Sequence, residues 1–232
     1  MERILEPEVM DTWEESIDYD SMDFTEVNTV FAQSAINLGP KIGKILDAGT
    51  GSARIPIIIA KLSPQWHLTC IDLSANMLKV GAINVENAGV KSQVKLELVD
   101  AKEMPYQNQE FDMVISNSII HHLPDPLPFL REVKRVLKSN GGLFLRDLLR
   151  PQDRETTDNL VEMYAGDCNE HQKRLFRDSL HAAFSLTEIT QMLEEAGLTD
   201  VKIYQSSDRH WSVEKAWGDY KTNRVSCDAL LP

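Results

Sequence analysis

From Lys44 to Leu148, short apolar stretches alternate with helical patterns, and this alternation constrains the fold more than any other feature of the chain. The stretch Phe111–Ser116 suits a strand that is buried on both faces. Such alternation predicts a doubly wound α/β fold, with parallel strands, right-handed crossovers and helices on both faces of the sheet. The expected strands are Lys44–Ala48, Trp66–Ile71, Val94–Val99, Phe111–Ser116 and Leu143–Leu148, and the expected helices are Ala53–Leu62, Ala75–Asn87 and Pro126–Leu137.

After Arg150 and Pro151 this rhythm breaks. Two polar helices are expected, and we place this insertion, roughly 151–183, over the carboxyl edge of the sheet. A capping box at Ser185–Glu188 then opens a helix that ends before Gly197. With a closing pair of strands, the chain is expected to form a seven-stranded, mostly parallel sheet. The elements of this part are Arg154–Tyr164, Glu170–Ala182, Ser185–Ala196, Val201–Gln205 and His210–Glu214.

Composition excludes several classes of function. The 232 residues carry 24 basic and 36 acidic side chains, a net charge of −12, which disfavours binding to nucleic acid or to anionic membranes. No apolar run is long enough to span a bilayer, and the first residues lead into acidic sequence without an apolar segment. The three cysteines, Cys70, Cys168 and Cys227, form no CxxC pair, so no disulfide framework is expected. We therefore expect a cytoplasmic protein that acts on a small molecule.

Four polar turns follow the predicted strands, where open α/β sheets bind their ligands. In the first, at 49–51, two glycines allow a tight bend and a close approach of backbone to ligand. Asp72 ends the second strand, where a carboxylate can accept hydrogen bonds from the hydroxyls of a ribose. Asp100 follows the third strand, and a turn rich in His and Pro, 116–126, follows the fourth.

Neither common phosphate-binding loop fits the glycine turn. A dinucleotide fingerprint needs a small residue where Arg54 stands, and the chain has no G-x-x-x-x-G-K-[ST] loop. A nucleoside that carries an amino-acid tail in place of a pyrophosphate suits this turn better.

With these motifs the chain resembles the class I S-adenosylmethionine-dependent methyltransferases, and within them the small-molecule branch that includes the quinone-biosynthesis type. The stretch 46–53 is similar to their motif I, 111–122 to the motif after their fourth strand, and 130–142 to the helix and Gly-Gly turn before their fifth. The resemblance is good over about 45–150 and loose elsewhere. It implies a Rossmann-like methyltransferase fold, S-adenosyl-L-methionine as cofactor, S-adenosyl-L-homocysteine as product, and in-line methyl transfer to an O, N or C atom of a small-molecule acceptor.

The same resemblance implies cofactor-binding roles. The two glycines would approach the methionine moiety, Asp47 would organise the loop, Asp72 would bind the ribose and Asp100 the adenine. Met77 would pack on the adenine face, although it could equally be a core residue of its helix. The residues that the resemblance assigns to the cofactor are Asp47, Gly49, Thr50, Gly51, Asp72, Leu73, Met77, Asp100, Ala101 and Asn117.

Three histidines are candidate bases, namely His121, His122 and His210. A base is needed only if the acceptor arrives with a proton to lose. Adjacent residues on an extended segment point in opposite directions, so we expect His121 and His122 not to share a metal ion, and we expect no metal site. In the alternative reading one of these rings packs structurally while the other lines the pocket. Arg146 and Asp147 end the fifth strand and are expected to face the pocket.

Two other functions remain open from the sequence. One is a non-catalytic, nucleoside-binding regulatory protein of the same fold, and the other, less favoured, is a nicotinamide-dependent oxidoreductase. Methylation of nucleic acid is disfavoured, because no N/D-P-P-Y/F motif follows the fourth strand. The sequence does not identify the acceptor or the oligomeric state.

Most of the negative charge lies in the first 40 residues. Residues 1–40 hold ten acids and one base, a balance of −9, whereas the other 192 residues hold 26 acids and 23 bases, a balance of −3. We therefore divide the chain into an acidic, helical N-terminal cap (1–40), with one helix at Asp23–Leu38, and a cofactor-binding methyltransferase domain (41–232). The cap would be a lid with Tyr19 and Phe24 turned inward, and the alternative is a solvated acidic face.

Overall fold

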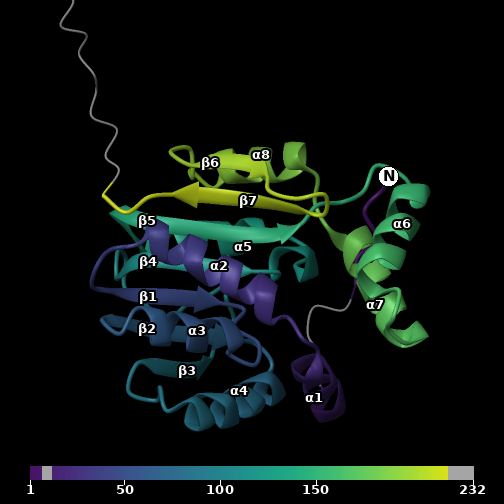
Figure 1. The fold of residues 1–232 in the computed structure, drawn as a ribbon. Coiled ribbons are helices and arrows are strands. Elements are labelled where there is room, and N and C mark those ends of the chain that lie inside the picture. The colour runs from purple at the N-terminus through teal and green to yellow at the C-terminus, as the bar shows by residue number, and fades with distance from the viewer. Residues whose placement is uncertain (7–11, 219–232) are drawn as a thin grey trace, which may run out of the picture.

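A seven-stranded sheet forms the centre of the computed structural model, which describes residues 1–6 and 12–218 (Figure 1). Its strands are β1 (Gly43–Ala48), β2 (Trp66–Asp72), β3 (Val94–Leu98), β4 (Phe111–Asn117), β5 (Leu137–Leu148), β6 (Lys202–Gln205) and β7 (His210–Lys215). They lie in the order β3-β2-β1-β4-β5-β7-β6. All neighbours from β3 to β5 pair in parallel, and β7 pairs antiparallel with both β5 and β6. The predicted seven-stranded, mostly parallel sheet is confirmed.

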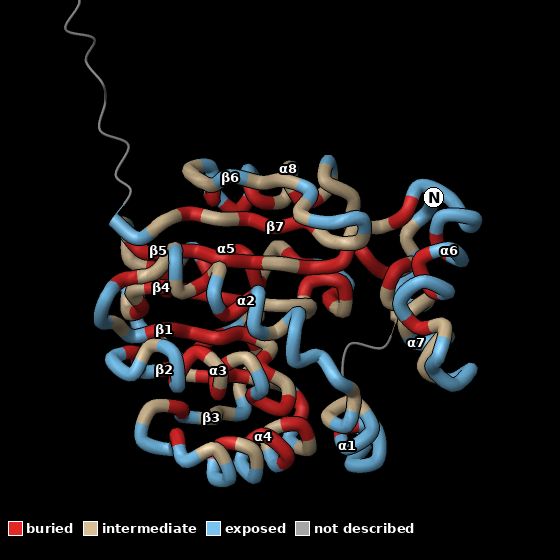
Figure 2. Tube along the Cα trace, viewed as in Figure 1, coloured by how far each residue is buried: buried red, intermediate tan, exposed pale blue. Residues whose placement is uncertain are grey.

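Helices cover both faces of this sheet. On one face α2 (Thr25–Leu38), α3 (Arg54–Leu62) and α4 (Ala75–Ala88) pack on a core that includes Ile45. On the other face α5 (Leu127–Val136) and α8 (Leu186–Glu195) pack on a second core, which includes the next residue of the same strand, Leu46. Alternate residues of a strand thus enter opposite cores. The central strands β1, β4, β5 and β7 are buried along most of their length, whereas the edge strands β3 and β6 are mostly not (Figure 2).

Three further helices lie beside the carboxyl ends of the parallel strands, namely α1 (Trp13–Ser21), α6 (Arg154–Ala165) and α7 (Glu170–Ala182) (Figure 1). The first residues of the chain join this group, because the backbone N–H of Ile4 donates to the carbonyl of His181 at 3.0 Å. The predicted helical insertion is therefore present, and the N-terminus packs against it.

Three local features differ from the sequence-based expectation. Helix α1 was not predicted, although Thr12 and Glu15 form a capping box at its start. The turn after β4 contains a 3-10 helix, η1 (Ile120–His122), where an extended segment was expected. Strand β5 begins at Leu137, six residues early, and its pairing with β4 shifts register between Phe111 and Met113.

The remaining sequence-based expectations concern cysteines and membranes. Cys70 and Cys168 are not joined in a disulfide, and Cys227 lies outside the described residues, as does the end of the proposed domain 41–232. Within residues 1–6 and 12–218, no helix has the length and apolar character needed to cross a bilayer.

Candidate functional site

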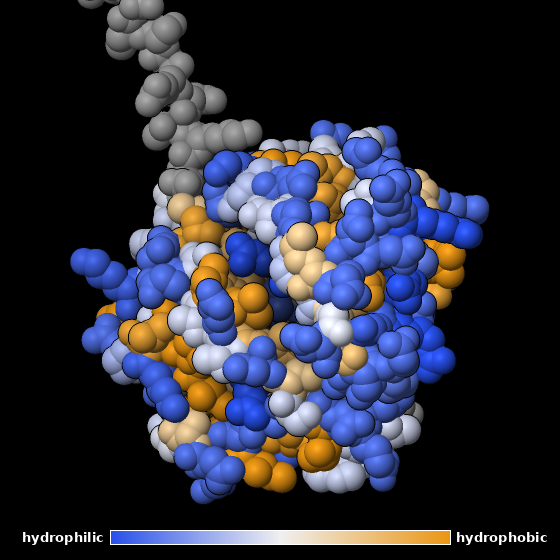
Figure 3. Space-filling view, turned by 45° about the vertical axis from the view of Figure 1, so that its right-hand side comes forward, coloured by the Kyte–Doolittle hydropathy of each residue, from blue (hydrophilic) through white to orange (hydrophobic). Residues whose placement is uncertain are grey.

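A cavity of about 830 Å³ lies at the carboxyl ends of β1, β2 and β4. Figure 3 shows a hollow near the centre of one face, with hydrophilic and hydrophobic side chains around it. The cavity collects most of the residues that the sequence assigned to the site: Gly49, Thr50, Gly51, Asp72, Leu73, Met77, Asp100, Ala101, Asn117 and His122. Asp47, His121 and His210 are not among the residues that line it.

The turn after β1 requires glycine at both of its glycine positions. Gly49 has φ +76° and Gly51 has φ +54°, in the left-handed region that side chains disfavour. A Cβ on Gly49 would also lie 2.9 Å from the side chain of Ile119. A Cβ on Gly51 would meet nothing within 4 Å, so the backbone here borders open space that a ligand can fill.

Asp72 presents a fixed and mostly buried carboxylate at the end of β2. Its Oδ2 accepts from the backbone N–H of Gly51 at 2.8 Å, and its Oδ1 accepts from that of Ser74 at 2.9 Å. Burial raises the pKa of Asp72, and these backbone donors oppose the rise. Because each carboxylate oxygen can accept a second hydrogen bond, Asp72 suits a vicinal pair of ribose hydroxyls.

The neighbouring wall offers an apolar surface beside one acceptor, which suits an adenine ring. Leu73 and Met77 line the cavity, Leu73 exposed and Met77 buried. Asp100 lies on the same wall, and its Oδ1 accepts from the backbone N–H of Lys102 at 2.8 Å. Met77 lines the cavity and is also buried in α4, so both of its predicted roles stay open.

Asp47 lies behind the glycine turn and is fully buried. Burial raises its pKa to about 7, the Thr50 side chain opposes this shift, and the negative charge of Asp72 adds to it. Its place agrees with a role in organising the loop, whereas direct contact with the cofactor is not supported by its position.

Helix α1 covers one side of the cavity. The carboxylate of Asp20 accepts from both Nε and Nη2 of Arg54 at 2.7 Å, and from Nδ2 of Asn84 at 3.0 Å. The rings of Tyr19 and Phe24 lie 5.6 Å apart and both line the cavity. In the sequence, Arg54 stands where a dinucleotide-binding loop needs a small residue. In the structure its guanidinium holds α1 in place through Asp20.

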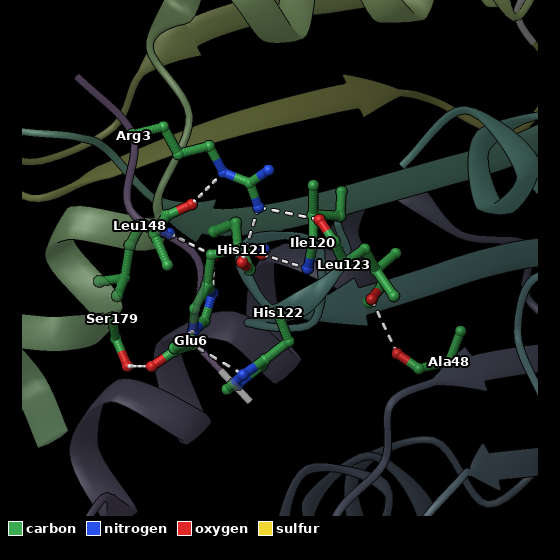
Figure 4. Close-up of polar contacts among 12 residues, drawn as sticks. Arg3, Glu6, Ala48, Ile120, His121, His122, Leu123, Leu148 and Ser179 are labelled. Atoms are coloured by element: carbon green, nitrogen blue, oxygen red, sulfur yellow. Dashed lines mark hydrogen bonds and ion pairs between the residues drawn. The ribbon is translucent and has the colours of Figure 1, made fainter. Parts of the chain in front are cut away.

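The two adjacent histidines do not point in opposite directions, so that expectation was wrong. In η1 their rings stack with centroids 4.1 Å apart and planes tilted by 35°. His121 Nε2 lies 3.3 Å, and His122 Nδ1 lies 3.2 Å, from Oε1 of Glu6 (Figure 4). The geometric reason for expecting no metal site therefore does not hold, because one ligand atom from each of Glu6, His121 and His122 lies within 4.8 Å of the other two.

His121 is buried and pairs through Nδ1 with Oδ1 of Asp147. Desolvation lowers the pKa of His121, but the charge and hydrogen bond of Asp147 and the charge of Glu6 outweigh it, so the pKa is raised. Asp147 was expected to face the pocket. It is instead buried, where its Oδ2 accepts from the backbone N–H of Ile120 at 2.6 Å.

His210 and Arg146 also lie away from the cavity lining. Burial lowers the pKa of His210 to about 4, and its Nδ1 lies 2.9 Å from Oγ of Ser207. Arg146 Nε donates to Oγ of Ser212 at 3.0 Å. Of the three candidate bases, His122 is therefore the one that reaches the cavity.

Comparison with known proteins gives matches to methyltransferases. Residues 41–197 match the family model of a methyltransferase domain. A demethylmenaquinone methyltransferase of Listeria welshimeri is 37% identical over 108 residues, which are 46% of this chain and 45% of that protein. A protein of the same name from Staphylococcus aureus is 30% identical over 174 residues, 69% of each chain. The chain thus spans about half the length of the Listeria relative and about two thirds of the staphylococcal one.

A solved structure extends the agreement to the whole fold. It is a putative S-adenosyl-L-methionine-dependent methyltransferase from Methanococcus maripaludis, with a TM-score of 0.70 at 18% identity, covering 94% of this chain and 99% of that one. Because the family model matches well over half of the 232 residues, and the cavity presents the predicted ribose and adenine carboxylates, the chain belongs to the class I S-adenosylmethionine-dependent methyltransferases, among which it resembles the quinone-biosynthesis type.

Proposed function

We propose that this protein transfers a methyl group from S-adenosylmethionine to a small-molecule acceptor held in the same cavity. The observation that carries the proposal is that Asp72 and Asp100, after β2 and β3, and His122 in η1 line the same cavity. When bound, the cofactor supplies a methyl group on a sulfonium that leaves as a neutral thioether. The chain's own residues then have to bind and orient the cofactor and the acceptor, exclude water from the cavity, and accept a proton from the acceptor.

Each of these tasks has a candidate residue. Asp72 and Asp100 bind the nucleoside, and the turn at 49–51 leaves room for the amino-acid tail. Helix α1, held by the Asp20–Arg54 pair, closes the cavity to water. His122 accepts the proton of an acceptor that carries one, and residues 1–40 act as a lid over the cavity.

The acceptor is a small molecule, and we expect neither nucleic-acid binding nor membrane insertion, in a cytoplasmic protein. The relatives from Listeria and Staphylococcus are named demethylmenaquinone methyltransferases. A quinone-type compound in its reduced, quinol form is therefore the first acceptor class to try here. We expect no resident metal ion, because the positive charge of Arg3 already lies beside the histidines.

The first experiment is a thermal-shift and calorimetric titration of the full chain with S-adenosylhomocysteine at up to millimolar concentration. Binding should raise the melting temperature, and NAD(H) should leave it unmoved. No shift with S-adenosylhomocysteine would refute the proposal, and stabilisation by NAD(H) alone would favour the oxidoreductase.

The second experiment separates an enzyme from a nucleoside-binding regulator. Methyl-labelled S-adenosylmethionine is incubated with a panel of a phenol, a quinol, a primary amine and a thiol, and label transfer is counted. Transfer that depends on Asp72 supports the enzyme. Binding without consumption of the cofactor on any acceptor would favour the regulator.

A further inference from the structure

We propose that Glu6 is a positioning residue that holds His122 as the proton acceptor, so that the first six residues of the chain complete the active site. This proposal rests on the proposed function and narrows its substrate to acceptors that must lose a proton: a hydroxyl, an ammonium or an activated C–H group. Nothing in the sequence around Glu6 suggested it, since the residue lies more than 110 positions from its partners.

The Glu6 carboxylate is fixed from both sides. Its Oε2 accepts from Oγ of Ser179 on α7 at 3.0 Å, and its Oε1 lies between the two imidazoles, 3.2 Å from His122 and 3.3 Å from His121. Its side chain is only 9% exposed. Figure 4 shows Glu6 pointing toward both rings from the N-terminal segment. A carboxylate held this way stabilises an imidazolium at His122 when a proton arrives.

The segment that carries Glu6 is anchored by Arg3. Its Nε donates to the carbonyl of Ala182 at 2.6 Å, and its Nη2 donates to the carbonyls of His121 and Leu123 at 3.0 and 2.8 Å. The guanidinium also lies 3.8 Å above the ring of Phe184. Arg3 thus joins the N-terminus to the same turn that presents the histidines, and docking of this segment and placement of Glu6 are one event.

The charges of the cluster favour a proton acceptor over a metal ion. Asp147 and Glu6 lie beside the guanidinium of Arg3 and beside His121, whose pKa is raised. Burial and the charges of Asp147 and Asp178 raise the pKa of Glu6, whereas His121 and the hydrogen bond from Ser179 lower it. A divalent cation would enter a cluster that already holds the positive charge of Arg3. A metal ion lies in the plane of each imidazole that binds it, whereas the two rings here stack with centroids 4.1 Å apart and planes tilted by 35°. His121 is 4% exposed and faces Asp147, so His122 is the member that meets the cavity.

The proton step balances as follows. The proton of the X–H group passes to a ring nitrogen of His122, before attack for an ammonium or a C–H group and during attack for a hydroxyl. The electron pair on X attacks the methyl carbon, an X–C bond forms, and the C–S bond breaks with its electron pair going to sulfur. Water removes the proton from His122 after the product leaves. The carboxylate of Glu6 balances the positive charge that His122 holds in between.

The test is a pH titration of the histidine ring nitrogens by NMR, on the full chain labelled with ¹⁵N-histidine, with and without S-adenosylhomocysteine. Glu6→Gln should lower the titration midpoint of His121, which the carboxylate raises, and should shift the ring resonances of His122. Glu6→Asp should restore part of both. Glu2→Gln, at an exposed residue of the same segment, is the matched control and should change neither. Unchanged His121 and His122 titrations in Glu6→Gln would overturn the proposal.

Two further measurements complete the test. On the acceptor that the panel identifies, Glu6→Gln should lower kcat roughly 10- to 100-fold and leave the KM for S-adenosylmethionine unchanged. The acidic limb of the pH profile of kcat should move to lower pH. Stoichiometric Zn²⁺ binding by chelator-treated wild type, lost in Glu6→Gln, would replace the proposal by a metal site. If no acceptor turns over, the proposed function fails, and the NMR titration still decides whether Glu6 is coupled to the two rings.

Discussion

The two halves of the candidate site are built in different ways: the cofactor half is the cavity wall at the ends of β1, β2 and β3, and the histidine half is the cluster of Arg3, Glu6, His121, His122 and Asp147. The cofactor half depends on contacts between neighbouring strands and turns, such as the bond between Gly51 and Asp72, which are 21 positions apart. The histidine half depends on contacts across almost the whole chain. Arg3 reaches Ala182 at a separation of 179 positions and His121 at 118.

The residues proposed to bind the cofactor and the residues proposed to act on the acceptor are therefore held in place by different kinds of contact. The cofactor half uses backbone geometry and a few carboxylates at strand ends, which the parallel sheet places automatically. The histidine half is assembled from the N-terminal segment, η1, the end of β5 and α7, so it needs elements that lie far apart in the sequence. We expect substitutions in the two halves to separate cofactor affinity from stability and proton transfer.

The largest effect should come from Asp72→Ala in the cofactor half. The variant loses a carboxylate that accepts from Gly51 and Ser74 and that would bind the ribose. We expect the Kd for S-adenosylhomocysteine, measured by calorimetry, to rise roughly 100-fold, about 2.7 kcal/mol. Asp167→Ala, at an exposed position between α6 and α7, should leave the Kd unchanged. Wild-type affinity in Asp72→Ala would remove the ribose assignment.

A substitution in the histidine half, Arg3→Ala, should affect stability and spare cofactor affinity. It deprives the carbonyls of Ala182, His121 and Leu123 of a charged donor. We expect a loss of about 2 kcal/mol, which for a chain of this length lowers Tm by roughly 4–8 °C. Arg174→Ala, at an exposed position on α7, should change Tm by less than about 2 °C. An equally large loss of S-adenosylhomocysteine affinity would mean that the two halves are coupled.

The buried acid of the cofactor half predicts a pH dependence. Burial raises the pKa of Asp47 in the folded state to about 7. The free energy of unfolding is therefore highest below pH 4, where Asp47 is protonated in both states, and it decreases as pH rises toward 7. Asp47→Asn removes this decrease while keeping the shape of the side chain. Its Tm relative to wild type should therefore increase from pH 5 to pH 8, corresponding to roughly 1–3 kcal/mol. Asp167→Asn should show no such trend, and a constant difference across this range would contradict the prediction.

The same contrast explains what the sequence could predict. Strand and helix positions follow from hydrophobic periodicity, so all seven strands and most helices were predicted. Their ends differ by little except in β5, which begins six residues early. The turns at the strand ends were predicted from the spacing of the glycines and from single carboxylates. Helix α1 was missed although Thr12 and Glu15 mark its start, because its nine residues are mostly polar and Ser16 is the one that is buried.

The histidine half could not be predicted for a physical reason. A 3-10 turn and an extended segment have similar local sequences, and tertiary bonds to Asp147 select the turn that stacks His121 on His122. Glu6 carries no local signal, and only the folded chain brings it to the rings. His210 was a candidate from residue type alone, and the antiparallel pairing of β7 with β5 places it away from the cavity lining.

The smallest effect should come from the contact that joins the N-terminal segment to the cofactor half, the Asp20–Arg54 pair. Arg54 is 52% exposed, so solvent screens the pair and its contribution is about 0.5–1 kcal/mol. If α1 closes over the bound nucleoside, Asp20→Asn should weaken S-adenosylhomocysteine binding roughly 2- to 5-fold, more strongly at low salt than at high salt. Asp18→Asn lies on the same helix at an exposed position and removes the same charge, so its affinity should stay at the wild-type value. Equal effects of the two variants would indicate a general influence of negative charge, and α1 would then be a solvated acidic face instead of a lid.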